Sequence, residues 1–548
     1  MTGARLIGYA GSGKTTELLA IMERALPHLG NDPRRLGFAS MTRAARATAV
    51  ERAAKAWSVP PATLDREGWF RTVHSTCLRC LESEDKLIGS SKADQEWLSE
   101  ALGVRLRTEI DEDYGTQRVI GDPVAATAIN CWALARVTLR PLGEVVRAMR
   151  AIDDDVPDLA LVVRMTQQYE TKKRIDNRLD YTDLLSRFAG WRFEPDDDPR
   201  RCEPQGYLPD VAAWLFDEQQ DASPLLDAVC KRLVSAPGVK WFYVVGDPFQ
   251  SIYGFAGATS DCFLGWDVAK ERTMAKSWRC PRQIMELGEK CLRRMSRGYF
   301  PRNVAPADHE GEVIERDEIG DLIRMIKPDE EWLLLGRSNF HADRLYAACN
   351  AASIPVRKVK SPEGANKRAV GMTALYRLER NEPVSGEAWG RAIELLPVST
   401  SNGEKILTRG TKTKWAKENA DHWDWIFRDD LEQVGATAAL IQRIRSGKWC
   451  ELPDYGQEWR TKAERHGVEL TCNPRVRTGT IHSVKGDEAD NVALLTTVGK
   501  RVEIGREDPR QGDEEHRLAY VAVTRAKRRF VVVNEGRAGR IVPRMEVL

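Results

Sequence analysis

The sequence has no long hydrophobic run and no excess of charge of either sign. None of its 548 residues belong to a stretch that approaches the roughly 18 uninterrupted apolar residues of a membrane-spanning helix. Its 83 Lys and Arg residues nearly balance its 81 Asp and Glu residues. A nucleic-acid surface must therefore be a local basic stripe. The beginning of the chain shows no signal-peptide pattern, so we expect a cytoplasmic protein without a membrane partner.

Cysteines with metal-ligand spacing are also scarce. Cys77 and Cys80 form the only CxxC among eleven cysteines, and no second CxxC or Cys/His cluster completes a zinc site. We therefore expect these two residues to be a buried pair on a helix. Scattered cysteines agree with a reducing compartment. Because the chain is too long for a single core, we expect about three or four domains.

The most informative segment, residues 8–15, has the form G-x-x-x-x-G-K-S/T of a phosphate-binding loop. Its glycines let backbone N–H groups wrap around phosphate oxygens, Lys14 supplies a positive charge, and the Thr15 hydroxyl can ligate Mg²⁺. Apolar residues before the loop and a helical pattern after it place the phosphates at a helix N-terminus. The expected ATP-binding residues of this loop are Gly8, Gly11, Ser12, Gly13, Lys14, Thr15 and Thr16.

A second phosphate-site element follows about 200 residues later, where the apolar run 211–216 ends in Asp217 and Glu218. This is the Walker B arrangement, in which the Asp holds Mg²⁺ and the Glu activates the attacking water. An acidic turn after a strand is a weak signal alone. It becomes a strong one because a phosphate loop precedes it.

A third element points to a family. The segment 243–258 resembles the GDxxQxIYxFRGA segment of the UvrD/Rep-type superfamily 1A DNA helicases. Further segments resemble the other motifs of that family in the same order; they are residues 40–45, 72–79, 179–185, 276–281, 480–488 and 515–527. The resemblance implies an α/β fold with two RecA-like P-loop NTPase lobes, each with a parallel sheet and a mainly helical insertion, and ATP between the lobes.

The same resemblance implies roles for residues of the nucleotide site. Gln250 would sense the γ-phosphate, and Arg279 and Arg525 would stabilise the charge that develops on it. Trp278 replaces the tyrosine that stacks on adenine, although it could instead be a core residue. Glu488 matches the glutamate that binds the ribose. Catalysis would thus rest on Lys14, Glu218, Gln250, Arg279 and Arg525, and Mg²⁺ on Thr15 and Asp217.

The resemblance also implies a track for single-stranded DNA. Non-specific binding of a strand needs aromatic faces for bases and donors for phosphates. The expected DNA contacts are Thr42, Arg43, His74, Tyr253, Phe255, His482 and Ser483. A packing or capping role is nearly as good an interpretation for each of them singly.

Four departures from the family pattern affect these expectations. Ala256 replaces an arginine of the DNA track, Ser40 or Met41 replaces an aromatic residue, and Asp487 replaces a leucine. The upstream glutamine segment that reads adenine has no room before Gly8. We therefore expect a weaker grip on DNA and a nucleotide choice that is looser than strict ATP.

The motifs divide the chain into six parts. Lobe 1A would comprise residues 1–85 and 179–270, separated by a helical insertion 1B at 86–178. Lobe 2A would comprise residues 271–360 and 475–548, separated by a reduced 2B-like insertion at 361–474. The basic stretch of this second insertion is either a solvated helix face or a duplex contact; it holds Lys405, Arg409, Lys412, Lys414, Trp415 and Lys417.

These patterns predict an ATP-dependent DNA helicase that moves 3′→5′ on single-stranded DNA and acts at single/double-strand junctions. One alternative is a single-strand translocase that unwinds only with a partner. Another is a nucleotide-gated DNA-binding subunit of a repair, recombination or defence complex. Nothing in the sequence identifies a protein partner, and nothing identifies a reader of the RNA 2′-hydroxyl.

Overall fold

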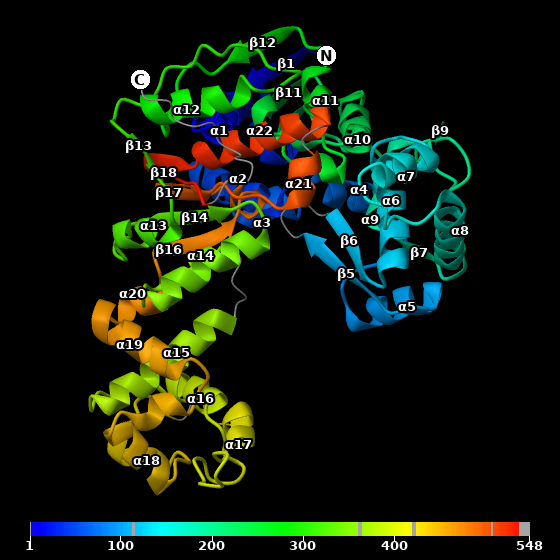
Figure 1. The fold of residues 1–548 in the computed structure, drawn as a ribbon. Coiled ribbons are helices and arrows are strands. Elements are labelled where there is room, and N and C mark those ends of the chain that lie inside the picture. The colour runs from blue at the N-terminus through cyan, green and yellow to red at the C-terminus, as the bar shows by residue number, and fades with distance from the viewer. Residues whose placement is uncertain (1, 112–115, 360–363, 419–422, 506–507, 536–548) are drawn as a thin grey trace. The chain divides into compact units, whose positions relative to one another are not determined.

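The computed structural model describes residues 2–111, 116–359, 364–418, 423–505 and 508–535 of the chain (Figure 1). The chain forms two compact units, each with one six-stranded sheet. The first unit comprises Met1–Pro281, Gly288–Asp308 and Ile504–Val521. The second comprises Arg282–Leu287, His309–Glu503 and Ala522–Leu548.

The first sheet is parallel throughout and places the ends of its strands at one edge. In spatial order its strands are β12 (Lys270–Thr273), β1 (Thr2–Ile7), β11 (Trp241–Gly246), β10 (Ala213–Asp217), β2 (Leu36–Ser40) and β3 (Trp69–Thr72). The run of apolar residues in β10 is buried along its whole length, as expected of a central parallel strand. In such sheets ligands bind beyond the carboxyl ends of the strands.

Helices cover the first sheet and bury its apolar side chains. Leu18 and Met22 of the first helix are fully buried in one core with Phe38 and Phe70 of the sheet. The helices of this part are α1 (Lys14–Ala25), α2 (Arg43–Trp57), α3 (Pro61–Asp65), α4 (Val73–Leu81), α9 (Tyr181–Ala189), α10 (Pro224–Val234) and α11 (Ser260–Leu264). The residues of α12 (Arg282–Leu292) and α22 (Pro509–Val523) are divided between the two units. Short turns of 3-10 helix are η1 (Leu26–Leu29), η2 (Pro33–Arg35), η3 (Gln219–Asp221), η4 (Pro248–Gln250) and η5 (Gly254–Ala256).

A mainly helical insertion interrupts the first unit and has its own core around Trp132 and Ile129. It consists of α5 (Lys92–Leu102), the hairpin β5 (Leu106–Asp111) and β6 (Thr116–Gly121), α6 (Pro123–Val137), α7 (Leu142–Arg150) and α8 (Leu159–Ile175). Two-residue strands flank it or follow it; they are β4 (Lys86–Leu87), β7 (Arg178–Leu179), β8 (Trp191–Arg192) and β9 (Arg200–Arg201).

The second sheet is also parallel throughout. Its strands, in spatial order, are β13 (Glu312–Arg316), β18 (Ala526–Val533), β17 (Ala489–Leu495), β14 (Trp332–Gly336), β16 (Val476–Thr480) and β15 (Val356–Lys358). Its other elements are α13 (Ile319–Met325), α14 (Asn339–Ala351), η8 (His482–Val484) and α21 (Lys500–Gly505). Leu322 and Leu345 of the helices are buried against Trp332 of the sheet.

The insertion of the second unit is helical, with a core around Trp389 and Trp449. Its elements are α15 (Gly364–Glu379), α16 (Gly386–Leu395), α17 (Thr411–Glu418), η6 (Arg428–Asp430), α18 (Ala438–Arg445), η7 (Lys448–Glu451), α19 (Gly456–His466) and α20 (Val468–Cys472). Trp415, the aromatic residue of the basic stretch, belongs to this core and donates its indole N–H to Val434 O at 3.2 Å. It therefore offers no ring for stacking on DNA.

The two parallel sheets confirm the expected α/β fold with a helical insertion in each half. The expected burial of Cys77 and Cys80 on a helix is also confirmed, since both lie in α4 and are almost fully buried. In the part of the chain that the structure describes, no helix is both long enough and apolar enough to cross a membrane.

Candidate nucleotide and nucleic-acid sites

The phosphate loop joins β1 to α1 at the carboxyl edge of the first sheet. Gly8 N donates to Gly246 O at 3.0 Å, so the loop leaves the sheet beside β11. Gly11 and Gly13 have φ angles of 70° and 83°, a left-handed conformation that favours glycine. Gly13 is the N-cap of α1, and Lys14 is the first residue of the helix. The N–H groups of that first turn lack partners within the helix and suit an anion.

Asp217 and Glu218 follow β10, the strand next to β11 in the sheet. The Asp217 side chain is only 2% exposed, and its carboxylate accepts the N–H of Glu218 at 2.9 Å. Burial and the neighbouring charge of Glu218 raise the pKa of Asp217 to about 7, against the opposing charge of Lys14. A buried carboxylate facing another acid is a site that a cation stabilises, so these residues fit Mg²⁺.

The backbone of Glu218 is unusual. Its φ angle of 54° is left-handed, which is uncommon for a residue with a side chain and carries strain. Its carboxylate accepts the amide N–H of Gln220 at 2.5 Å. The turn η3 begins directly after Glu218.

Gln250 lies in η4, just after β11, and is 5% exposed. Its Nε2 donates to Asp247 Oδ2 at 2.7 Å. Asp247 N in turn donates to Gln220 Oε1 at 3.0 Å. Hydrogen bonds therefore connect Gln250 with Glu218 through Asp247 and Gln220, and the first unit brings these expected catalytic residues to one edge.

Trp278 and Arg279 belong to the first unit and lie against the phosphate loop. Trp278 N donates to Gly11 O at 2.8 Å, and Ser277 Oγ donates to Ala10 O at 2.9 Å. A Cβ atom added to Gly11 would lie 2.4 Å from Cβ of Arg279. The Trp278 ring is 67% exposed, with the Lys276 ammonium 4.5 Å from its centroid. An exposed indole beside the loop can stack on a base, whereas a core tryptophan could not.

Glu488 and Arg525 lie in the second unit, at the amino-terminal edge of its sheet. Glu488 Oε1 pairs with Lys527 Nζ at 2.9 Å. Arg525 is 2% exposed and donates to Asp487 O at 3.2 Å. The Asp487 carboxylate accepts from Arg477 at 2.8 Å, which explains why an acid stands where the family pattern has leucine.

Three expected DNA contacts lie after β2 and β3, beside Asp217 in the register of the sheet. Thr42 is buried and caps α2 by accepting the N–H of Ala45 at 3.0 Å, so its hydroxyl has a structural role. Arg43 is exposed. His74 is half-buried, packs edge-on against Tyr181 and has its pKa lowered to about 4 by desolvation, so it is neutral at pH 7.

The two expected stacking residues differ sharply in exposure. Phe255 is 66% exposed in η5, whereas Tyr253 is only 5% exposed. Their ring centroids lie 5.9 Å apart. Tyr253 therefore supports the Phe255 ring, and Phe255 is the ring that a base can reach.

His482 and Ser483 follow β16 at the carboxyl edge of the second sheet. Ile481 N donates to Gly336 O at 3.2 Å, which holds this turn beside the end of β14. Ser483 Oγ donates to Thr480 O at 2.9 Å, so the hydroxyl closes the turn. Both residues are half-buried.

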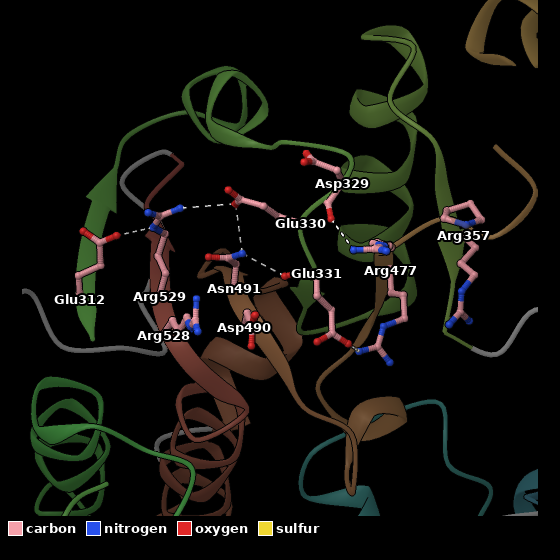
Figure 2. Close-up of a pocket in the computed structure, with 12 residues that line it drawn as sticks. Glu312, Asp329, Glu330, Glu331, Arg357, Arg477, Asp490, Asn491, Arg528 and Arg529 are labelled. Carbon is pink, nitrogen blue, oxygen red and sulfur yellow. Dashed lines mark hydrogen bonds and ion pairs between the residues drawn. The ribbon is translucent and has the colours of Figure 1, made fainter. Parts of the chain in front are cut away.

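A charged cavity of about 730 Å³ lies at the opposite, amino-terminal edge of the second sheet (Figure 2). Five arginines and five acidic residues line it, so its formal charge is zero. Arg529 pairs with Glu312 at 2.5 Å, and Arg477 pairs with Glu331 at 3.0 Å. Matched charges favour a surface ion-pair network over an anion-binding site.

Sequence reasoning missed one group of residues beside the nucleotide site. Tyr9, Glu289, Tyr299, Arg302 and Tyr520 come together in the first unit, although only Tyr9 and Tyr520 lie within motifs. Tyr9 lies inside the phosphate loop, and Tyr520 lies in the segment 515–527. No local pattern could have brought Arg302 to it, because 293 positions separate the two residues in the chain.

Comparisons with known proteins agree with this geometry. A family model described as the UvrD/REP helicase N-terminal domain matches residues 4–268, and one described as the UvrD-like helicase C-terminal domain matches residues 461–535. The putative ATP-dependent DNA helicase YjcD of Bacillus subtilis is 22% identical over 601 residues, which covers 95% of this chain and 75% of that protein.

Two further relatives are mycobacterial. The ATP-dependent DNA helicase UvrD1 of Mycobacterium leprae is 27% identical over 271 residues, which covers 46% of this chain and 32% of that protein. The ATP-dependent DNA helicase UvrD1 of Mycobacterium tuberculosis is 29% identical over 201 residues, which covers 35% of this chain and 24% of that protein.

Proposed function

Because the chain belongs to the UvrD/REP family of superfamily 1 DNA helicases, we propose that it moves 3′→5′ along single-stranded DNA and separates the strands of a duplex ahead of it. Family membership makes the chain an ATP-dependent DNA helicase. The direction of travel and autonomous strand separation are the proposal. The form of the segment 243–258 supports 3′→5′ travel.

One observation carries the proposal: the first unit gathers the phosphate loop and the side chains expected to be catalytic at a single sheet edge. Lys14 would bind the phosphates, with Glu218 as general base and Gln250 as γ-phosphate sensor. Asp217 and Thr15 would hold Mg²⁺, which would polarise the phosphate oxygens and neutralise developing charge. The loop residues Gly8, Gly11, Ser12, Gly13 and Thr16 would contact the phosphates.

The remaining nucleotide contacts are proposed from their placement and the family pattern. Trp278 would stack on the base, and its exposure beside the loop supports this role. Arg279, whose backbone lies against Gly11, would bind the γ-phosphate. Arg525 and Glu488 would serve as the second γ-phosphate arginine and the ribose ligand; both rest on the motif match alone.

The proposed DNA track begins with Phe255 and Arg43, the most exposed of the expected contacts of the first unit. Aromatic stacking and a cation are the two interactions that sequence-independent strand binding needs. Neutral His74 and the turn residues His482 and Ser483 would add polar contacts. Thr42 and Tyr253 would act by holding their neighbours in place.

The test is strand displacement on a duplex with a 3′ single-stranded tail and on one with a 5′ tail, with ATP hydrolysis followed in both. We expect displacement of the 3′-tailed substrate and hydrolysis that rises strongly with single-stranded DNA. Equal hydrolysis with and without DNA would contradict the motor. Hydrolysis without displacement of either substrate would instead identify a translocase that unwinds only with a partner.

A further inference from the structure

Arg302 is buried among three aromatic rings beside the nucleotide site. Its guanidinium carbon lies 5.1 Å from the ring centroid of Tyr9, 5.3 Å from that of Phe249 and 4.7 Å from that of Tyr520. These distances allow cation–π attraction, which is strongest where the cation is desolvated. The three rings belong to the phosphate loop, to η4 and to α22, so one cation joins three segments that are far apart in sequence.

Hydrogen bonds fix the orientation of this guanidinium. Its Nε and Nη2 donate to Glu289 Oε2 at 3.0 Å and 2.5 Å. Tyr299 Oη donates to the other Glu289 oxygen at 2.5 Å. Nη1 of Arg302 donates to Tyr520 Oη at 2.8 Å. Although burial opposes the charge, the neighbouring Tyr520 and Glu289 raise the pKa of Arg302, so the cation is permanent.

The chain of contacts continues from Tyr520 to the catalytic edge. Tyr520 Oη, which accepts from Arg302, donates to Asp247 Oδ2 at 3.4 Å. The same Asp247 oxygen accepts Gln250 Nε2 at 2.7 Å. The other Asp247 oxygen accepts the N–H of Phe249 at 3.1 Å. Tyr520 thus lies between a fixed cation and the carboxylate that orients Gln250.

We propose that Arg302 and Tyr520 are positioning residues that hold Gln250, by way of Asp247, in the orientation needed to sense the γ-phosphate. This rests on the sensor role given to Gln250 in the proposed function. A sensor amide must keep one orientation before the phosphate arrives, since preorganised donors stabilise the transition state at no cost of reorganisation. Removing the Tyr520 hydroxyl would take one donor from Asp247 Oδ2, the oxygen that accepts from Gln250, and so weaken the restraint on the Gln250 amide.

Tyr520→Phe tests this directly, because it removes one oxygen and keeps the ring that packs on Arg302. Tyr299→Phe is the matched control. It also removes one tyrosine hydroxyl, but that hydroxyl donates to Glu289 and not to Asp247. We expect Tyr520→Phe to lower the DNA-stimulated kcat about tenfold. The KM for ATP and the melting temperature should match those of Tyr299→Phe.

A second comparison separates positioning from general damage. In a Gln250→Ala background, Tyr520→Phe should cause no further loss of kcat, because residues that act as a unit are non-additive. Equal losses in the two tyrosine variants, or an undiminished Tyr520→Phe effect without Gln250, would overturn the positioning role. A wild-type protein whose hydrolysis ignores DNA would instead overturn the proposed motor itself.

Discussion

The Lys14 side chain packs directly against Gly8, because a Cβ atom added to Gly8 would lie 2.2 Å from Cγ of the lysine. Only glycine leaves room for this side chain, and the lysine charge opposes the rise in the pKa of Asp217. The phosphate loop therefore places the Lys14 charge where it interacts with the carboxylate of Asp217 at the end of β10. A bound phosphate would meet the positive charge of Lys14 beside the loop.

Lys14→Ala should abolish ATP turnover, because the phosphates lose their point charge. The measurement is phosphate release in the presence of a long oligonucleotide. Lys231→Ala is the control, since this half-exposed lysine of the same unit pairs with Asp227 at 2.7 Å and touches no phosphate-loop residue. Turnover of Lys14→Ala within about threefold of the control would contradict the phosphate role.

Glu218→Gln should keep nucleotide binding and lose hydrolysis. The amide is close in shape to the carboxylate but cannot take a proton from water, and general-base loss costs about 10²–10⁴ in rate. Binding of a fluorescent ATP analogue and single-turnover hydrolysis separate the two effects. Glu17→Gln serves as control, because Glu17 lies in the first turn of α1 and pairs with Arg272 at 2.7 Å. If Glu218→Gln hydrolyses ATP normally, another group is the base.

Phe255→Ala should weaken nucleotide-free binding to single-stranded DNA by about 1–3 kcal/mol, the usual value of one base–aromatic stack. Fluorescence anisotropy with a labelled oligonucleotide at two salt concentrations measures it. The salt dependence should not change, because no cation is lost. An unchanged affinity in the folded variant would remove Phe255 from the track.

Trp278→Ala is the reciprocal case, because this ring is equally exposed but lies beside the phosphate loop. We expect a higher Kd for ATP and an unchanged affinity for the oligonucleotide. Phe255→Ala and Trp278→Ala thus control for each other. A variant that weakened both ligands equally would show that exposure alone, and not position, explains the effect.

The sequence predicted the fold correctly, and it also gave candidate nucleotide residues, because both depend on local patterns. The buried apolar run of β10 ending in Asp217, and the glycines of the loop, specify their structures within a few residues. The pair Asp487–Arg477 could not be predicted, because nothing within β16 shows that Arg477 is buried and needs a partner. Contacts between residues that come together only in the folded chain have no local sequence pattern.

The solvent exposure of individual side chains also could not be predicted from local patterns. Tyr253 and Phe255 occupy neighbouring motif positions, yet only the second ring is accessible. Trp415 lies among lysines in the sequence but packs into a helical core, because its side of α17 faces Trp389 and Val434 rather than solvent. Motif matching therefore gives candidate DNA segments but cannot rank their side chains by exposure.

His74 gives a prediction about pH. Desolvation lowers its pKa from 6.5 to about 4, so the folded protein binds fewer protons than the unfolded chain between these pH values. Stability linked to this residue is therefore complete above pH 6.5 and is lost as the pH falls toward 4. At pH 4.5 the loss should be about 2–3 kcal/mol.

His74→Phe keeps a ring that can pack against Tyr181 but cannot take up a proton. Urea unfolding at pH 7 and pH 4.5 should show a smaller acid destabilisation in this variant than in the wild type, while His28→Phe, at an exposed histidine, should behave like the wild type. Because His74 is neutral at pH 7, its replacement should also leave the salt dependence of DNA binding unchanged. Equal acid destabilisation of all three proteins would show that His74 titrates in the folded state much as it does in the unfolded chain. A reduced salt dependence of DNA binding in His74→Phe would show that His74 carries a charge on the DNA track.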